Sequence, residues 1–171
     1  HIGRNDAAGY FYYVMELADC ENAECRVQSA ELGSGTGGTD FVQVESYVPR
    51  TLKLELYRRG RLPVAECVEI GLALTTALGN LHSHGLVHRD IKPSNIVFVK
   101  GAAKLGDIGL VTDAGDSQSI VGTEGYLPPE GPGTSQGDIY SLGKVLYEIS
   151  TGMDRRRFAE LPEDLREWPA R

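Results

Sequence analysis

Apolar residues recur every three or four positions along two long stretches of the chain, which is the spacing of a helix with one buried face. These stretches cover residues 63–85 and 135–152, and residues 51–59 predict a shorter helix before them. Ser135 and Asp138 stand at the spacing of a capping box, so we expect Ser135 to be the N-cap of the last helix. The apolar positions of the first long stretch are Val64, Cys67, Val68, Gly71, Leu72, Leu74, Leu78 and Leu81.

The segments that predict strands are shorter and fewer than the helices. Residues 10–17 are rich in aromatic and β-branched side chains, which is typical of a strand. Residues 95–99 and 103–105 are two apolar runs separated by Lys100 and Gly101, and they predict a small hairpin. Residues 106–133 have no sustained period, so we expect a long functional loop there. Together these elements predict an α+β fold in which helices dominate.

Residues 19–50 form a segment of a different composition, rich in Gly, Ser, Thr and acidic residues. Gly33, Gly35 and Gly38 match a dinucleotide-binding fingerprint, which requires a strand before the glycines and a helix after them. Residues 39–44 predict a strand instead of a helix. We therefore interpret residues 19–50 as a flexible Gly-rich insertion.

Composition places the chain among ordinary soluble globular domains. It has 171 residues with 17 Lys and Arg against 24 Asp and Glu, a net charge of −7, and this acidic balance argues against a nucleic-acid partner. No apolar run approaches the ~20 residues that cross a bilayer, so we predict no membrane segment within the chain. Cys20, Cys25 and Cys67 suit neither a disulfide framework nor a zinc site, which favours reduced thiols and a cytoplasmic location. A membrane anchor outside this segment stays open.

The strongest chemical motif covers residues 88–95, with the sequence His-Arg-Asp-Ile-Lys-Pro-Ser-Asn. It fits the pattern His-Arg-Asp-Leu-x-x-x-Asn of a catalytic loop for phosphoryl transfer, a reaction that depends on positioning and charge neutralisation. We expect the Asp90 carboxylate to orient and deprotonate the attacking hydroxyl. Lys92 would offset charge on the transferring group, and Asn95 would return an amide oxygen to a metal ion.

Three further motifs follow in a fixed order. Asp107-Ile108-Gly109 matches the metal-binding Asp-Phe-Gly pattern with Ile for Phe, and residues 122–130 end in Pro-Pro-Glu where Ala-Pro-Glu is expected. Residues 138–143 open the last predicted helix. With these motifs, residues 13–152 resemble a eukaryotic-like protein kinase, and residues 122–152 are most similar to the bacterial Ser/Thr kinases of that family.

This resemblance implies that the chain is a partial protein kinase domain. Residues 1–18 would supply the last strand of the N-lobe and the hinge, residues 19–50 the insertion, and residues 51–171 a truncated, mainly helical C-lobe. The rest of the N-lobe, which holds the phosphate loop and the Lys–Glu pair, would lie outside the sequence, as the missing initiator Met also suggests. Lys53 is too close to His88 to be that lysine.

The resemblance also assigns a nucleotide site. Met15 would be the gatekeeper, the backbones of Glu16 and Ala18 would bind adenine, and Val97 would pack beneath it. Asn95 and Asp107 would hold Mg²⁺, or Mn²⁺ in its place, on the phosphates of ATP.

Other family positions concern the catalytic loop and its control. Thr123 would bridge Asp90 and Lys92, Asp138 would hold the catalytic-loop backbone, and His88 would pack with Ile108. Arg89 implies control by phosphorylation of the activation segment, for which the candidate acceptors are Thr112, Ser117 and Ser119.

These residues predict transfer of the ATP γ-phosphoryl group to Ser/Thr hydroxyls of protein substrates in the full-length protein, with the isolated fragment inactive. Two alternatives stay open: a pseudokinase or scaffold that binds protein partners without catalysis, and a small-molecule kinase of the antibiotic-phosphorylating type. The segment 123–130 argues against the second alternative, because peptide docking needs it.

Several polar residues carry no predicted chemistry. His82, His84 and His88 lack a carboxylate or thiol to complete a metal site, and residues 155–157 predict a solvated basic patch. Glu130 would pair with an Arg of helices that this chain does not reach.

Overall fold

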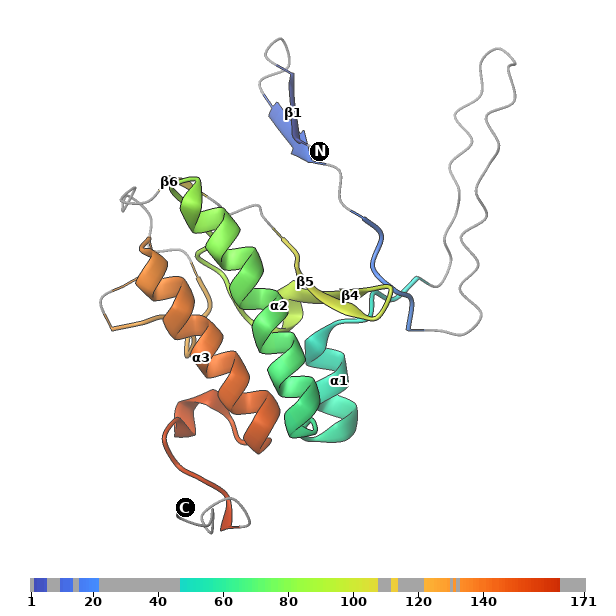
Figure 1. The fold of residues 1–171 in the computed structure, drawn as a ribbon, viewed down its shortest axis with the longest axis vertical. Helices are drawn as coiled ribbons and strands as arrows, with labels where there is room; N and C mark the ends of the chain where they lie inside the picture. Colours follow the sequence, from blue (N-terminus) through green and yellow to red (C-terminus); the bar gives the residue numbers. More distant parts are fainter. Residues whose placement is uncertain are drawn as a thin grey trace.

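The computed structural model describes residues 2–5, 10–13, 16–21, 47–107, 112–113, 122–129, 131 and 133–163. Its helices are long and its sheets are two-stranded, which confirms the predicted α+β class (Figure 1). In chain order the elements are β1 (Ile2–Asn5), β2 (Tyr10–Tyr13), α1 (Leu52–Arg59), α2 (Val64–Ser83), β3 (Leu86–Val87), η1 (Pro93–Asn95), β4 (Ile96–Val99), β5 (Ala102–Leu105), β6 (Thr112–Asp113), α3 (Ser135–Thr151) and η3 (Arg155–Arg157).

The bounds of α1 and α2 follow local signals in the sequence. The Thr51 hydroxyl accepts the Leu54 N–H and caps α1, and Gly60 ends it at a φ of 73°. Pro63, which cannot donate a backbone hydrogen bond, stands at the N-cap of α2. Both predicted helices are confirmed.

Helix α2 has two apolar stripes, of which one is buried. Cys67, Ile70, Leu74 and Leu78 are buried, and the helix packs against α3 and β5. The prediction of a single buried face is wrong for Val64, Val68 and Leu72, which are exposed. Their spacing of four residues forms a second stripe on the solvent side. Among the described helices α2 alone is long and apolar enough to cross a membrane, by length and composition only. Its four buried residues belong to the hydrophobic core cluster.

Helix α3 begins one residue earlier than a Ser135 cap would place it. The N-cap is Thr134, whose hydroxyl accepts the Gly137 N–H at 3.0 Å, so the predicted capping box is wrong. Asp138 is turned instead toward the loop after β3. The helix ends as predicted at Gly152, where φ is 71° and a Cβ would stand 2.9 Å from the Gly60 carbonyl oxygen. Only glycine allows this close approach of α3 to the α1–α2 connection.

The predicted hairpin is present as β4 and β5, which pair antiparallel from Ile96↔Leu105 to Val99↔Ala102. Lys100 and Gly101 form its turn with φ of 52° and 79°. The Asp19 carboxylate accepts the N–H groups of both turn residues, at 2.7 and 2.8 Å. A second small sheet pairs β3 with β6, and β6 lies within the predicted loop of residues 106–133.

The N-terminal strand is shorter than predicted. Strand β2 ends at Tyr13 and pairs with β1, which the sequence pattern did not indicate, while residues 16–19 have no regular structure. The two ends of segment 19–50 lie against each other and the β4–β5 hairpin, through Cys20↔Pro49 and the Asp19 N–H to Phe98 carbonyl bond of 2.6 Å. Residues 22–46, with the Gly-rich patch, lie outside the described residues.

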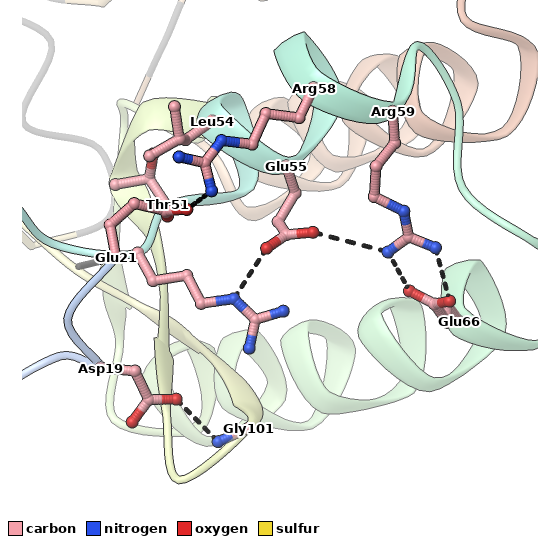
Figure 2. A network of polar contacts seen from close by, with 10 residues as sticks. Asp19, Glu21, Thr51, Leu54, Glu55, Arg58, Arg59, Glu66 and Gly101 are labelled. Carbon is pink, nitrogen blue, oxygen red and sulfur yellow. Dashed lines mark hydrogen bonds and ion pairs between the residues drawn. The ribbon is translucent and has the colours of Figure 1, made fainter. Parts of the chain in front are cut away.

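A network of charged side chains ties these ends to the helices (Figure 2). Glu55 accepts from Arg50 at 2.7 Å and from Arg59 at 3.5 Å, and Arg59 binds Glu66 of α2. Arg58 pairs with Glu21 in the same network. The side chains of Glu21 and Glu55 are largely buried, whereas Glu66 and the arginines are at least partly exposed. An exposed pair such as Arg59–Glu66 contributes about 0–1 kcal/mol, so this pair orients α1 more than it stabilises the fold.

Candidate active site

The His88–Asn95 motif covers the loop after β3 and the whole of η1. Asp138 of α3 holds the start of this loop through hydrogen bonds. The Asp138 carboxylate accepts the backbone N–H of His88 at 2.8 Å and that of Arg89 at 2.9 Å. It also lies 2.8 Å from Nε2 of His82 on α2. Arg89 has a φ of 72°, a left-handed conformation that requires such external support. The predicted role of Asp138 as an anchor of this loop is confirmed.

Asp90 is the centre of a cluster of hydrogen bonds inside this loop. Its Oδ1 accepts from the Thr123 hydroxyl at 2.8 Å, and its Oδ2 accepts from Lys92 Nζ at 2.7 Å. The Asn95 amide donates to Oδ2 and to the Asp90 carbonyl, both at 2.9 Å. These bonds fix the rotamer of a carboxylate that is only 7% exposed.

The electrostatic surroundings keep the Asp90 carboxylate ionised. Burial by itself raises the pKa, but hydrogen bonds from Lys92, Thr123 and Asn95 and the Lys92 charge outweigh it and leave the pKa below its usual value. A carboxylate that is ionised, oriented and partly buried can accept a proton from a hydroxyl group held against it.

Lys92 and Thr123 meet each other as well as Asp90. The lysine Nζ donates to the Thr123 hydroxyl oxygen at 2.8 Å, and that hydroxyl donates to Asp90. Thr123 therefore lies between the two groups, as predicted, although it is 31 residues from Lys92 in the chain. The Lys92 side chain is 24% exposed, so it remains partly accessible from solvent.

Asn95 and Asp107 can supply oxygen ligands to a metal. The Asn95 nitrogen is engaged with Asp90, which leaves the amide oxygen, at 3.4 Å from the Ser94 hydroxyl, as the coordinating atom. The Gly106 N–H donates to the Asn95 carbonyl at 2.7 Å and brings the start of the Asp107 motif beside η1. An amide oxygen with a carboxylate is a donor set that suits Mg²⁺ or Mn²⁺.

The nucleotide-binding residues assigned by resemblance are only partly described. Met15 lies outside the described residues, as does Ile108, the predicted neighbour of His88. Glu16 is exposed and pairs with Lys104, and the Ala18 carbonyl accepts from the Tyr47 hydroxyl at 2.9 Å. Tyr47 was not predicted, because nothing in its surroundings in the sequence places it beside Ala18. Val97 is half-buried on β4, next to Gly106.

Comparison with known proteins gives this cluster its family. The model of the protein kinase domain matches residues 27–159, which is more than half of the chain. The chain belongs to the protein kinase domain family. Residues 1–18, which carry the predicted hinge, precede the matched range, so their assignments stay predictions, as do the domain boundaries.

The relatives of this kinase segment are bacterial serine/threonine kinases. It is 35% identical over 135 residues to serine/threonine-protein kinase PknB of Mycobacterium leprae, and the aligned region covers 72% of this chain and 22% of that protein. It is 39% identical over 118 residues to serine/threonine-protein kinase PknG of Mycolicibacterium smegmatis, and the aligned region covers 67% of this chain and 15% of that protein. The kinase segment therefore spans about a fifth or less of these relatives, and it is of their bacterial type.

A cluster of polar side chains that was not predicted lies between α3 and residues 122–129. Glu148 of α3 is buried, accepts from the Tyr126 hydroxyl, and pairs with the Arg155 guanidinium at 3.4 Å. Burial and the contact with Glu148 raise the pKa of Tyr126 well above its usual value. The signal available in the sequence was a Glu between the buried positions Val145 and Ile149 of a helix.

Arg155 corrects the interpretation of residues 155–157. Its guanidinium lies 4.5 Å over the Tyr126 ring, and its side chain is 22% exposed, so it belongs to this cluster. Arg156 and Arg157 are exposed, as predicted for a solvated patch. Thr112 lies in β6, while Ser117, Ser119 and Glu130 lie outside the described residues.

Proposed function

We propose that the full-length protein containing this chain transfers the γ-phosphoryl group of ATP to Ser or Thr hydroxyls of protein substrates. The observation that carries the proposal is the joint placement of Lys92, Thr123 and Asn95 around the Asp90 carboxylate. Each group has a separate task in phosphoryl transfer.

The chemistry of these residues follows from their contacts. Asp90 orients the acceptor hydroxyl and takes its proton, and Lys92 places a positive charge where the transferring group gains negative charge. Asn95 and Asp107 would hold the metal, and Mg²⁺ when bound neutralises charge on the phosphates. By resemblance, Met15, Glu16, Ala18 and Val97 would surround the adenine of ATP.

The preference for Ser and Thr rests on the resemblance of Lys92 and Thr123 to the corresponding residues of Ser/Thr kinases, and it gives the direct test. We expect the full-length protein to phosphorylate Ser and Thr peptides with Mg²⁺ and ATP and to leave matched Tyr peptides unlabelled. Incorporation of ³²P into a peptide library measures this. Phosphorylation of Tyr peptides alone would contradict the substrate class, and labelling of no peptide would favour the pseudokinase alternative.

We also propose that the 171-residue chain has no appreciable kinase activity by itself. A nucleotide is positioned by a Gly-rich loop and a Lys–Glu pair, which the motifs of this chain do not supply. Turnover of ATP by the isolated chain above the background of its Asp90→Asn variant would contradict this expectation.

The cellular setting is a proposal of the same kind. Reduced cysteines and a site for ATP favour a cytoplasmic location of this segment. Protein substrates are the proposed partners, and the acidic charge gives no support to a nucleic-acid partner.

A further inference from the structure

A groove of about 440 Å³ runs from α1 to the catalytic loop, on the acceptor side of the site. Helix α1 and its end contribute Lys53, Leu56 and Tyr57, and the catalytic cluster contributes Lys92 and Thr123. Lys92 and Thr123 both line this groove and both contact Asp90, so a peptide that lies along the groove can bring a hydroxyl close to Asp90.

The ionisable side chains that line the groove are predominantly basic. Among the lining residues that the structure describes, Lys53, Lys92 and Arg155 face a single carboxylate, that of Glu148. Glu148 has both oxygens engaged: Oε1 accepts from the Arg155 backbone N–H at 3.1 Å and lies near its guanidinium, and Oε2 accepts from Tyr126. Its charge is therefore already compensated inside the protein, and it offers little to a basic side chain of a peptide.

Lys53 is the one cation among the described lining residues that remains available. It is exposed in the first turn of α1 and makes no hydrogen bond or ion pair with any other residue of the described part of the chain. A lysine in a first turn opposes the helix dipole, so local helix stability does not explain its presence. Lys92, by contrast, is bound to Asp90, and the Glu124 carboxylate lies at 3.7 Å from Arg156 and does not line the groove.

We infer that this groove selects protein substrates with an acidic side chain close to the phosphorylated Ser or Thr, with Lys53 as its principal contact. The inference rests on the proposed kinase function and specifies its substrate class. Tyr57, which is 87% exposed on the same helix, gives the peptide an aromatic surface beside the charge. A carboxylate and a phosphate share this chemistry, and we assign the groove to the carboxylates of Asp and Glu.

The test measures phosphorylation of a positional peptide library by the full-length protein. Asp, Glu, phosphoserine, Gln or Lys is placed at each position around a fixed Ser, and kcat/KM is determined for each peptide. We expect a preference of about five- to tenfold for Asp or Glu over Gln at one or two positions, which is the size of one partly exposed charge contact. We expect Lys at those positions to be disfavoured further.

Substitution of Lys53 identifies the contact. Lys53→Gln should reduce the Glu-to-Gln preference to about twofold or less, and Lys53→Glu should reverse it toward Lys peptides. The matched control is Lys100→Gln, which removes an exposed lysine from the β4–β5 turn outside the groove and should leave the preference unchanged. A wild-type preference for Lys peptides, or an equal loss in both glutamine variants, would overturn the inference. A preference for phosphoserine alone would overturn its assignment to carboxylates.

A binding measurement separates this inference from the kinase function. Fluorescence anisotropy of labelled Glu and Lys peptides reports the groove without turnover. If no peptide is phosphorylated but the Glu peptide binds more tightly and loses this advantage in Lys53→Gln, the groove is supported and the kinase function fails. If Ser and Thr peptides are phosphorylated without regard to charge, the kinase function stands and the groove inference is overturned.

Discussion

Replacement of Asp90 by Asn in the full-length protein is expected to lower kcat by about 10²–10⁴-fold, the usual contribution of a positioned general base. An amide of the same shape cannot accept the proton of the attacking hydroxyl. It also removes the negative charge that holds Lys92, which donates to Oδ2 at 2.7 Å. Steady-state kinetics with a Ser peptide and saturating ATP would measure the change.

The control for Asp90→Asn is Glu66→Gln, which removes an exposed carboxylate near the start of α2 (Figure 2). We expect its kcat to stay within about twofold of the wild-type value, because exposed ion pairs contribute little. An Asp90→Asn protein that keeps its kcat within the same range would contradict the assigned role.

The pH dependence follows from the surroundings of Asp90. Because Lys92, Thr123 and Asn95 hold the pKa of Asp90 below its usual value, the carboxylate is fully ionised at neutral pH. The stability that these contacts add is present above the pKa of the unfolded chain and is lost as the pH falls through the lower folded value. A loss of kcat between pH 6 and 7, if seen, would therefore arise from another group.

The helices could be predicted from the sequence because their signals are local. Thr51, Gly60 and Gly152 mark ends that depend on neighbouring residues, and the structure has those ends. The catalytic loop was predictable for a similar reason, since His88–Asn95 carries its groups within eight positions. The buried stripe of α2 was predictable only in part, because exposed Val68 and Leu72 have the same spacing as the buried residues.

The remaining features depend on contacts between distant residues. Arg155 belongs to a buried cluster because α3 places Glu148 beside Tyr126, a contact across 22 positions that no local pattern contains. Strand β1 was missed because a short segment becomes a strand only through its partner, here β2. Thr134 replaces Ser135 as the cap of α3 because Asp138 is held by the catalytic loop and takes no part in capping.

The anchoring of the catalytic loop leads to the second large effect. Asp138→Ala is expected to lower the free energy of unfolding of the kinase domain by about 3–5 kcal/mol. The carboxylate is only 3% exposed, and its loss leaves the buried N–H groups of His88 and Arg89 without an acceptor. It also removes the partner of His82 and the support for the left-handed conformation of Arg89.

The size of this loss matters because domains are stable by only about 5–15 kcal/mol. Urea unfolding followed by circular dichroism would measure it, with Asp154→Ala as the matched control. Asp154 is an exposed aspartate that caps η3 by accepting the Arg156 N–H at 2.8 Å, so its loss should cost about 1 kcal/mol. Asp138→Asn keeps one acceptor oxygen and should fall between the two. Equal stabilities of the Asp138→Ala and Asp154→Ala proteins would mean that α3 does not hold the catalytic loop through this carboxylate.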